Sequence, residues 1–132
     1  MENICLDTTI LVDFLRNKRD AVVFIEANEI INHLATTYVN LFELYYGAAL
    51  SANPNNNFIA VENIRRRLTI LNLSEEAVKQ AGKILADLEK QGKSAEIRDV
   101  LIGSIALAEG FSIKTSNIKH FTGIKGLKID EH

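Results

Sequence analysis

The segment Ile97–Glu109 limits the possible folds more than any other part of the chain. Its apolar residues, placed on a helix, leave almost no polar face; they are Ile97, Val100, Leu101, Ile102, Ile105, Ala106, Leu107 and Ala108. A helix that is apolar nearly all round is stable in water only when other elements cover it. Gly110 follows the segment, as glycine commonly follows a helix C-terminus. The sequence therefore predicts a helix sandwiched inside a layered domain.

Short strand-like runs alternate with longer helix-like segments along the chain. Strands are predicted at residues 3–6, 34–36, 68–73, 111–115 and 127–129. Helices are predicted after Asp7, at residues 20–32, from Tyr38 through Ala49, at residues 58–67, from Ser74 to Gly92 and at residues 97–109, with a break at residues 53–57. Strands separated by helices favour right-handed crossovers and parallel pairing. We expect a single domain over residues 1–132, with an α/β, three-layer α/β/α fold and a central, mainly parallel sheet of four or five short strands.

Composition narrows the class of protein. The 132 residues are 47% hydrophobic and 24% charged, with 15 Lys and Arg against 17 Asp and Glu, which is typical of a globular domain. The net charge of −2 argues against a protein that holds nucleic acid by bulk electrostatics alone. The single cysteine, Cys5, lies in an apolar run and favours a reducing, cytoplasmic compartment. Asp13 interrupts the apolar stretch at residues 10–15, so neither a signal peptide nor a membrane span is expected.

Three carboxylates occupy positions that suit a functional site. Asp7 follows the first predicted strand, where parallel α/β sheets form their ligand crevice. Asp99 opens the most apolar helix, and Gly103 one turn later leaves room for a groove. Glu43 lies opposite the apolar stripe of its helix, on the same side as Asn40. Each carboxylate also has a simpler explanation: a helix cap for Asp7 and Asp99, and a solvated face for Glu43.

Taken together, the three carboxylates favour a metal site. The elements that bear them can converge at one sheet edge, and we expect no lysine or histidine at matching positions. Two carboxylates about 4 Å apart repel by about 4 kcal/mol at an effective dielectric constant of 20, so they separate, bind protons or hold a cation. Oxygen ligands without paired Cys or His motifs suit Mg²⁺ or Mn²⁺ better than zinc. Such an acidic site is well suited to phosphoryl chemistry.

Four segments resemble the successive motifs of the PIN-domain ribonucleases. They read CLDTTILVD at residues 5–13, VNLFELYYGA at residues 39–48, RDVLIGSIA at residues 98–106, and TSNIKHF at residues 115–121 followed by GLKI at residues 126–129. The resemblance covers essentially the whole chain in order. It is strongest to the VapC-type toxins of prokaryotic toxin–antitoxin pairs. It implies a PIN-like fold and a metal-dependent endoribonuclease that cuts RNA by hydrolysis of phosphodiester bonds.

The resemblance also implies roles for individual residues and partners. Asp7, Glu43 and Asp99 would form the acidic core that binds Mg²⁺ or Mn²⁺, and Asn117 aligns with the fourth catalytic position. Because asparagine offers a neutral oxygen, a second ion would bind weakly. The expected products carry a 5′-phosphate and a 3′-hydroxyl. The expected partners are the RNA substrate, a cognate antitoxin that blocks the acidic groove, and a second copy of the chain in a homodimer.

Further polar residues accompany these motifs. Glu96 lies one helical turn before Asp99 and is either an additional oxygen ligand or an acidic residue that favours the helix start. Thr8, Thr115 and Ser116 either orient the ligands or a phosphate through their hydroxyl groups, or serve as caps and turn residues.

Basic residues near the motifs suggest contacts with the RNA backbone. Arg98, Lys114 and Lys119 are expected to contact phosphates at the rim of the site. His120 has an acid–base interpretation, but it precedes Phe121 after a predicted strand, which favours a structural role.

Other functions remain open from the sequence. The chain could be a PIN nuclease in RNA processing that is not a toxin, or a catalytically inactive PIN-like binding protein. A receiver-type signalling domain has a similar length and strand order. It requires an acidic pair at the first strand and a lysine after the last, and the sequence has neither in place.

Overall fold

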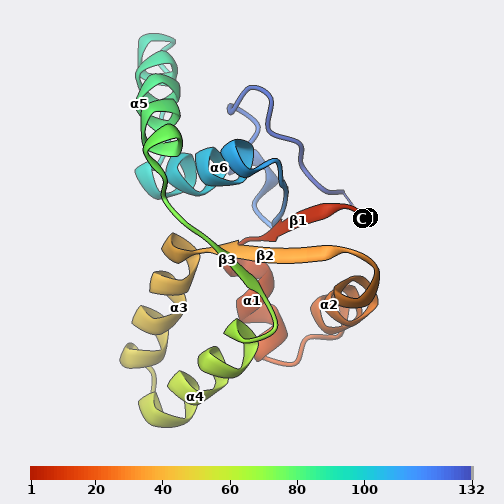
Figure 1. Ribbon diagram of the computed structural model, residues 1–132. Helices are drawn as coiled ribbons and strands as arrows, with labels where there is room; N and C mark the ends of the chain where they lie inside the picture. The colour runs from red at the N-terminus through yellow and green to blue at the C-terminus, as the bar shows by residue number, and fades with distance from the viewer. Residues whose placement is uncertain (132) are drawn as a thin grey trace.

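A parallel sheet lies at the centre of the computed structural model, which describes residues 1–131 (Figure 1). Over these residues the sheet has four strands, β1 (Asn3–Leu6), β2 (His33–Thr37), β3 (Thr69–Leu71) and β4 (Ser112–Lys114), in the order β3-β2-β1-β4. In register, Cys5 lies beside Ala35 on β2 and beside Ile113 on β4. The predicted parallel sheet is confirmed.

Helices cover both faces of this sheet, as the three-layer prediction requires (Figure 1). On one face lie α1 (Thr8–Leu15), α2 (Arg19–Ile31), α3 (Tyr38–Leu50) and α4 (Pro54–Arg65). On the other lie α5 (Glu75–Lys90) and α6 (Ile97–Glu109). A short 3₁₀ helix, η1 (Ile118–His120), follows β4. In the described part of the chain, no helix has the length and apolar character needed to cross a bilayer.

The alternation of side chains along the strands creates a separate apolar core on each face of the sheet. On the α1–α4 side, Leu6 is fully buried with Leu11 of α1. On the other side, Cys5 and Ala35 are fully buried with Ile105 of α6. The central strands are therefore apolar on both faces, which explains why they read as continuous apolar runs.

The helix α6 is sandwiched as the sequence predicted. Ile105 faces the sheet, Ile102 packs with Phe121 of the C-terminal segment, and Val100 packs with residues of α5. Only its first residue departs from the expectation, since Ile97 is 63% exposed. The helix is held on three sides, which fixes the position of the residues at its N-terminus.

Shortening Ile105 to valine tests this packing. The side chain is fully buried, so the Ile105→Val change is expected to lower the free energy of unfolding by about 1 kcal/mol. In the same helix, Ile97→Val is expected to change it by less than about 0.5 kcal/mol because that side chain is exposed. Urea unfolding followed by circular dichroism measures both values. Equal changes in the free energy of unfolding for the two variants would contradict the burial of the helix face that carries Ile105.

Two predicted boundaries are wrong. The break at residues 53–57 is shorter than expected, because α4 begins at Pro54 and includes the asparagines that follow it. Proline is well suited to the first turn of a helix, since its fixed φ matches and its missing N–H has no helical partner there. The strand predicted at residues 127–129 is reduced, among the described residues, to a single bridge between Ile113 and Ile129.

Gly103 does not open a groove as expected. A Cβ atom at this position would overlap the δ-methyl group of Ile124 and lie 3.2 Å from a methyl of Leu127. The glycine instead lets the C-terminal segment pack directly on α6. The access to Asp99 therefore comes from the N-terminal end of α6 and not from the side of Gly103.

Candidate active site

Asp7 lies at the point where the sheet reverses its winding. It follows β1, and its backbone N–H donates to the carbonyl of Lys114 at the end of β4, at 2.9 Å. The chain leaves β1 on one face of the sheet and reaches β4 from the other, and ligands bind at such switch points in parallel sheets. Asp7 occupies the N-cap position of α1, but its side chain accepts no cap hydrogen bond from the described backbone. The helix-cap explanation of its carboxylate is therefore wrong.

Side chains from distant elements hold the Asp7 carboxylate instead. Asn40 of α3 donates to Oδ1 at 3.1 Å, and Thr115 after β4 donates to Oδ2 at 2.7 Å. The Thr9 hydroxyl lies 3.4 Å from Oδ2. Asp7 is only 5% exposed, so these donors supply the stabilisation that a buried carboxylate needs.

Asn40 connects this carboxylate to the start of α3. It is fully buried, and its Nδ2 donates to Asp7 and to the Thr8 hydroxyl, the latter at 2.9 Å. Its Oδ1 accepts from the backbone and hydroxyl of Thr37, whose Oγ1 in turn accepts from the Asn40 N–H at 3.1 Å. This reciprocal pair is a capping box. Asn40 was not among the predicted site residues, although its spacing from Thr37, directly after a predicted strand, was an available signal.

Glu43 lies on α3 about one turn beyond Asn40. Its Oε1 accepts from Thr8 Oγ1 at 2.6 Å, and its Oε2 lies 2.7 Å from Nη1 of Arg98. The Glu43 side chain is 15% exposed, so it does not belong to a solvated face. Because Asn40 donates to Thr8 and Thr8 donates to Glu43, one chain of hydrogen bonds links the Asp7 and Glu43 carboxylates.

Asp99 faces this group from the first turn of α6. It is 6% exposed, and its Oδ2 lies 3.1 Å from Nδ1 of His120 in η1. Burial raises the pKa of the Asp99 carboxyl, the charges of His120 and Arg98 oppose that rise, and the charges of Asp7 and Glu96 add to it. The contribution of Asp7 to this rise is repulsion between two like charges, which favours the protonated form of Asp99.

Two basic side chains, Arg98 and His120, reach the carboxylates, and His120 contradicts the expectation that no lysine or histidine would lie there. Arg98 contacts Glu43 and also lies 3.5 Å from Glu96 and 4.0 Å from Asp99. His120 contacts Asp99, so its role is not confined to the core. Both residues were candidates for a role near the site from the sequence. The direction of their side chains was not predictable, because it depends on contacts between α3, α6 and η1.

The remaining predicted residues lie at the edge of the site. Glu96 is the N-cap residue of α6, and its 65% exposed side chain pairs with Arg98. The backbone N–H groups of Ser116 and Asn117 donate to Thr9 Oγ1 and Thr115 Oγ1, both at 3.0 Å. Both Ser116 and Asn117 are exposed. The structure thus brings their backbones, rather than their side chains, into the network around Asp7.

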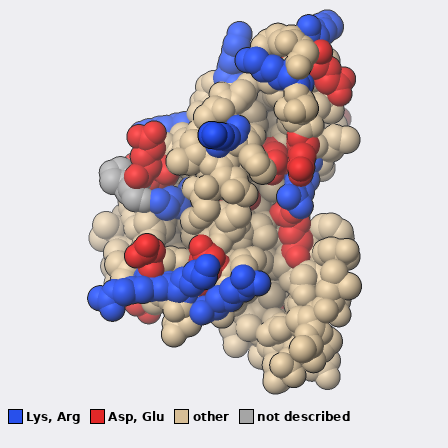
Figure 2. Space-filling model, turned by 180° about the vertical axis from the view of Figure 1, so that it is seen from behind, with Lys and Arg blue, Asp and Glu red and all other residues tan. Residues whose placement is uncertain are grey.

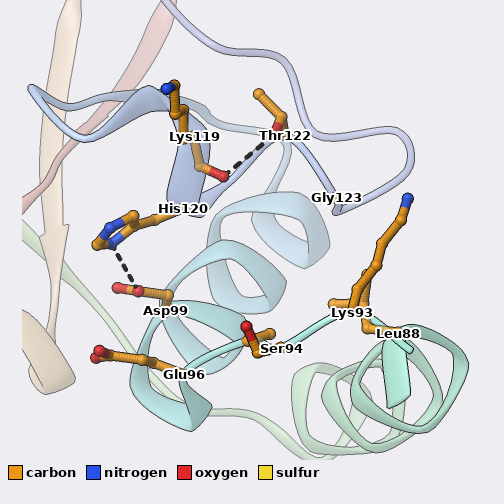
Figure 3. Close-up of a pocket in the computed structure, with 10 residues that line it drawn as sticks. Leu88, Lys93, Ser94, Glu96, Asp99, Lys119, His120, Thr122 and Gly123 are labelled. Atoms are coloured by element: carbon orange, nitrogen blue, oxygen red, sulfur yellow. Dashed lines mark hydrogen bonds and ion pairs between the residues drawn. The ribbon is translucent and has the colours of Figure 1, made fainter. Parts of the chain in front are cut away.

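A cavity of about 800 Å³ opens beside Asp99. In Figure 3, Asp99 and His120 face each other on one side of it, and Lys93 rises on another side from the segment that follows α5. Lys119 and Glu96 complete the polar part of the lining. Figure 2 shows acidic and basic side chains together in the hollow between the α5–α6 part of the molecule and the α3–α4 part.

The donor set suits a divalent cation. Asp7, Glu43 and Asp99 offer carboxylate oxygens, which are the ligands that Mg²⁺ and Mn²⁺ prefer. Within residues 1–131, however, no three acidic, histidine or cysteine side chains are close enough together to hold an ion as they stand. Arg98 occupies one oxygen of Glu43 and His120 contacts one of Asp99. The chemistry of the donor set thus suits a divalent ion, whereas its present arrangement pairs two of the three carboxylates with basic side chains.

The profile of the PIN domain family matches residues 4–123. The match spans the strand end that bears Asp7, the helix that bears Glu43 and the helix start that bears Asp99. The chain therefore belongs to the PIN domain family. PIN-domain ribonucleases generally depend on a divalent metal ion.

Individual relatives narrow the class within this family. The chain is 30% identical to Ribonuclease VapC2 of Haemophilus influenzae over 95% of its own length and 94% of that protein. It is 31% identical to the tRNA(fMet)-specific endonuclease VapC of Shigella flexneri, over 96% and 95% of the two chains. The VapBC2 structure from Rickettsia felis, bound to a DNA fragment from its promoter, superposes with a TM-score of 0.89 at 28% identity, over 96% of both chains. The chain belongs to the VapC ribonucleases, and it is a toxin endoribonuclease and not a receiver domain.

Proposed function

We propose that Asp7, Glu43 and Asp99 hold a Mg²⁺ or Mn²⁺ ion with which this chain hydrolyses RNA phosphodiester bonds. The observation that carries the proposal is the buried Asp7 carboxylate. It accepts hydrogen bonds from two elements distant in sequence, through Asn40 and Thr115, and caps no helix. A buried carboxylate held by long-range donors, with two further carboxylates facing it, is typical of a functional site.

The chain's own residues would position the reacting groups. A bound divalent ion would activate water and neutralise charge on the phosphate. Thr115 and Asn40 fix Asp7, and Thr8 fixes one oxygen of Glu43, so two of the three carboxylates are held in place before any substrate arrives. This preorganisation supports Asp7 and Glu43, with Asp99, as the residues that hold the ion.

Residues at the edge of the carboxylate site would assist the hydrolysis of RNA. We assign Asn117 the fourth catalytic position, with a neutral oxygen, and Ser116 a place beside it in contact with a phosphate. Glu96 lies where it can accept hydrogen bonds at the cavity wall, and Lys93 and Lys119 line that cavity. Their positive charges would attract the phosphates that flank the bond to be cut.

We further propose transfer RNA as the substrate class and an antitoxin protein as the partner. The Shigella flexneri relative is a tRNA(fMet)-specific endonuclease, and the Rickettsia felis and Salmonella typhimurium structures are VapBC assemblies bound to DNA. On α3, Phe42 and Tyr46 are 66% and 59% exposed and stack with ring centroids 6.2 Å apart. Such an exposed apolar surface suits a contact with the antitoxin or with a second copy in a homodimer.

The same proposal covers the organisation and location of the protein. All four strands within the described residues share one sheet, which supports a single domain over residues 1–132; His132 lies outside the described residues. A buried free thiol at Cys5 and an RNA substrate support a cytoplasmic location.

Metal removal tests the proposed function. Purified protein is incubated with a panel of transfer RNAs in Mg²⁺, in Mn²⁺ or in excess EDTA, and the products are separated on denaturing gels. We expect cleavage with either ion, loss of cleavage in EDTA, and recovery when the ion is restored in excess. Cleavage that persists in EDTA would refute a metal-dependent site. Absence of both cleavage and Mn²⁺ binding would instead support an inactive PIN-like binding protein.

A further inference from the structure

The Arg98 guanidinium occupies the oxygen of Glu43 that a metal ion would need. Glu43 Oε1 accepts the Thr8 hydroxyl at 2.6 Å, whereas Oε2 pairs with Arg98 Nη1 at 2.7 Å. The Thr8 contact belongs to a part-buried chain of hydrogen bonds that also includes Asn40, whereas Oε2 is held by the half-exposed Arg98 side chain. A cation that binds Glu43 through Oε2 therefore has to displace the guanidinium.

The surroundings of Arg98 make this displacement favourable. Its guanidinium lies among three carboxylates, with Glu96 at 3.5 Å and Asp99 at 4.0 Å in addition to Glu43. A divalent ion brings twice the charge of a guanidinium to the same carboxylates and repels it. The Arg98 side chain is 55% exposed, so it can leave Glu43 without opening the core. The charge of the incoming ion replaces the positive charge that the carboxylates lose when Arg98 leaves.

A destination for the displaced side chain lies next to it. Glu96 and Asp99, both near Arg98, also line the cavity of about 800 Å³ that holds Lys93 and Lys119. A guanidinium offers paired N–H donors that match two phosphate oxygens, which an ammonium group does not. Arg98 does not line the cavity itself, but from its place beside Glu96 and Asp99 a turn of the side chain would add a bidentate phosphate ligand to the two lysine charges.

We propose that Arg98 pairs with Glu43 in the metal-free protein and turns to an RNA phosphate when a divalent ion takes Glu43. This inference rests on the proposed function of the carboxylates. It makes Arg98 a positioning residue with two opposite effects. Without RNA it weakens metal binding, because it competes for Glu43; with the metal present it strengthens RNA binding, because it contributes a phosphate contact. A structural ion pair that stays closed would lack the second effect, because Arg98 would then not reach the RNA.

Metal binding without RNA tests the first effect. Titration calorimetry with Mn²⁺ alone compares the wild type, Arg98→Gln and Lys119→Gln. The last variant removes one positive charge from the cavity beside Asp99, but Lys119 has no described contact with Glu43. We expect Arg98→Gln to bind Mn²⁺ about fivefold more tightly than the wild type, and Lys119→Gln to differ by less than about twofold. Equal or weaker binding by Arg98→Gln would overturn the inference.

RNA binding tests the second effect. Steady-state cleavage of one transfer RNA in saturating Mn²⁺ is expected to show a KM about tenfold higher for Arg98→Gln, with a smaller change in kcat. The slope of log KM against log salt is expected to fall by about one for the lost phosphate contact. An unchanged KM and salt slope would overturn the second effect.

NMR observation of the Arg98 side chain distinguishes its displacement from Glu43 from changes elsewhere in the protein. The Arg98 Nε–H signal in ¹⁵N NMR spectra is assigned by its absence in Arg98→Gln and followed during addition of Mg²⁺. We expect it to shift with the same midpoint as metal binding. A signal that stays constant while Mg²⁺ binds would refute the exchange and leave the proposed function intact. Failure of the wild type and Arg98→Gln alike to bind any ion would count against the proposed function itself.

Discussion

Asp99→Asn is expected to reduce RNA cleavage in saturating Mg²⁺ by on the order of 10³-fold, or about 4 kcal/mol of transition-state stabilisation. The change keeps the shape of the side chain but replaces a charged oxygen ligand by a neutral amide. Asp99 lines the cavity and lies beside Arg98, which also contacts Glu43. Initial cleavage rates measure the loss, and Mn²⁺ titration shows whether it comes from metal binding.

The same substitution is expected to stabilise the fold at neutral pH. Burial raises the pKa of the Asp99 carboxyl in the folded protein, so the folded state binds its proton more tightly than the unfolded state does. The stability that this proton confers is complete below the ordinary aspartate pKa and is lost as the pH rises through the higher folded pKa. Because asparagine carries no charge, Asp99→Asn avoids this loss. Its Tm should exceed that of the wild type at pH 7, and the difference should shrink in acid.

The combination of lower activity and higher stability identifies a functional carboxylate. Asp87→Asn provides a matched control, because Asp87 is an exposed aspartate on α5. We expect this control to leave both the cleavage rate and the Tm within experimental error of the wild type. If Asp99→Asn retained more than about a tenth of the wild-type rate, the proposed metal site would be wrong.

The ends of several helices were predictable from the sequence, because they depend on residues within one helical turn. Ser74 was predicted as the N-cap of α5, and its hydroxyl accepts the Ala77 N–H at 3.1 Å. Gly110 was predicted to end α6, and it adopts a left-handed φ of 75°. Both signals act within one helical turn, so the sequence displays them directly. The same reasoning failed at residues 55–57, where the helix that starts at Pro54 overrides the turn preference of asparagine.

The candidate site was predictable in part. The positions of Asp7 and Asp99 at a strand end and a helix start placed them at the same edge of a parallel sheet. Asn40 was not recognised, because its partner Asp7 is 33 residues away in the sequence. Helical periodicity shows which face a residue occupies, but not which side chain of another element meets it. The pairing of Arg98 with Glu43 escaped prediction for the same reason.

Asn40→Asp is expected to lower the free energy of unfolding at pH 7 by about 3 to 5 kcal/mol. The substitution replaces a donor that lies 3.1 Å from Asp7 Oδ1 with a carboxylate oxygen. Asn40 is fully buried, so water screens the resulting repulsion poorly. Urea unfolding at pH 7 measures the loss.

A matched control variant and the capping geometry show whether repulsion with Asp7 causes the lower stability of Asn40→Asp. Asn63→Asp changes an exposed asparagine near the end of α4 and is expected to alter stability by less than about 0.5 kcal/mol. At residue 40, aspartate keeps the oxygen that accepts from Thr37, so the capping box of α3 survives the change. A stable Asn40→Asp variant would show that capping is the main contribution of this side chain.

The response of Asn40→Asp to metal distinguishes a charged site from a packing defect. If repulsion between residues 7 and 40 causes the loss, a divalent ion that neutralises both carboxylates restores stability. Mn²⁺ should therefore raise the Tm of Asn40→Asp by more than it raises that of the wild type. A general distortion of α3 would instead weaken metal binding, because Glu43 lies on the same helix, and Mn²⁺ would then have the smaller effect on the variant. The direction of this difference decides whether Asn40 acts on the Asp7 carboxylate or only on the helix that carries it.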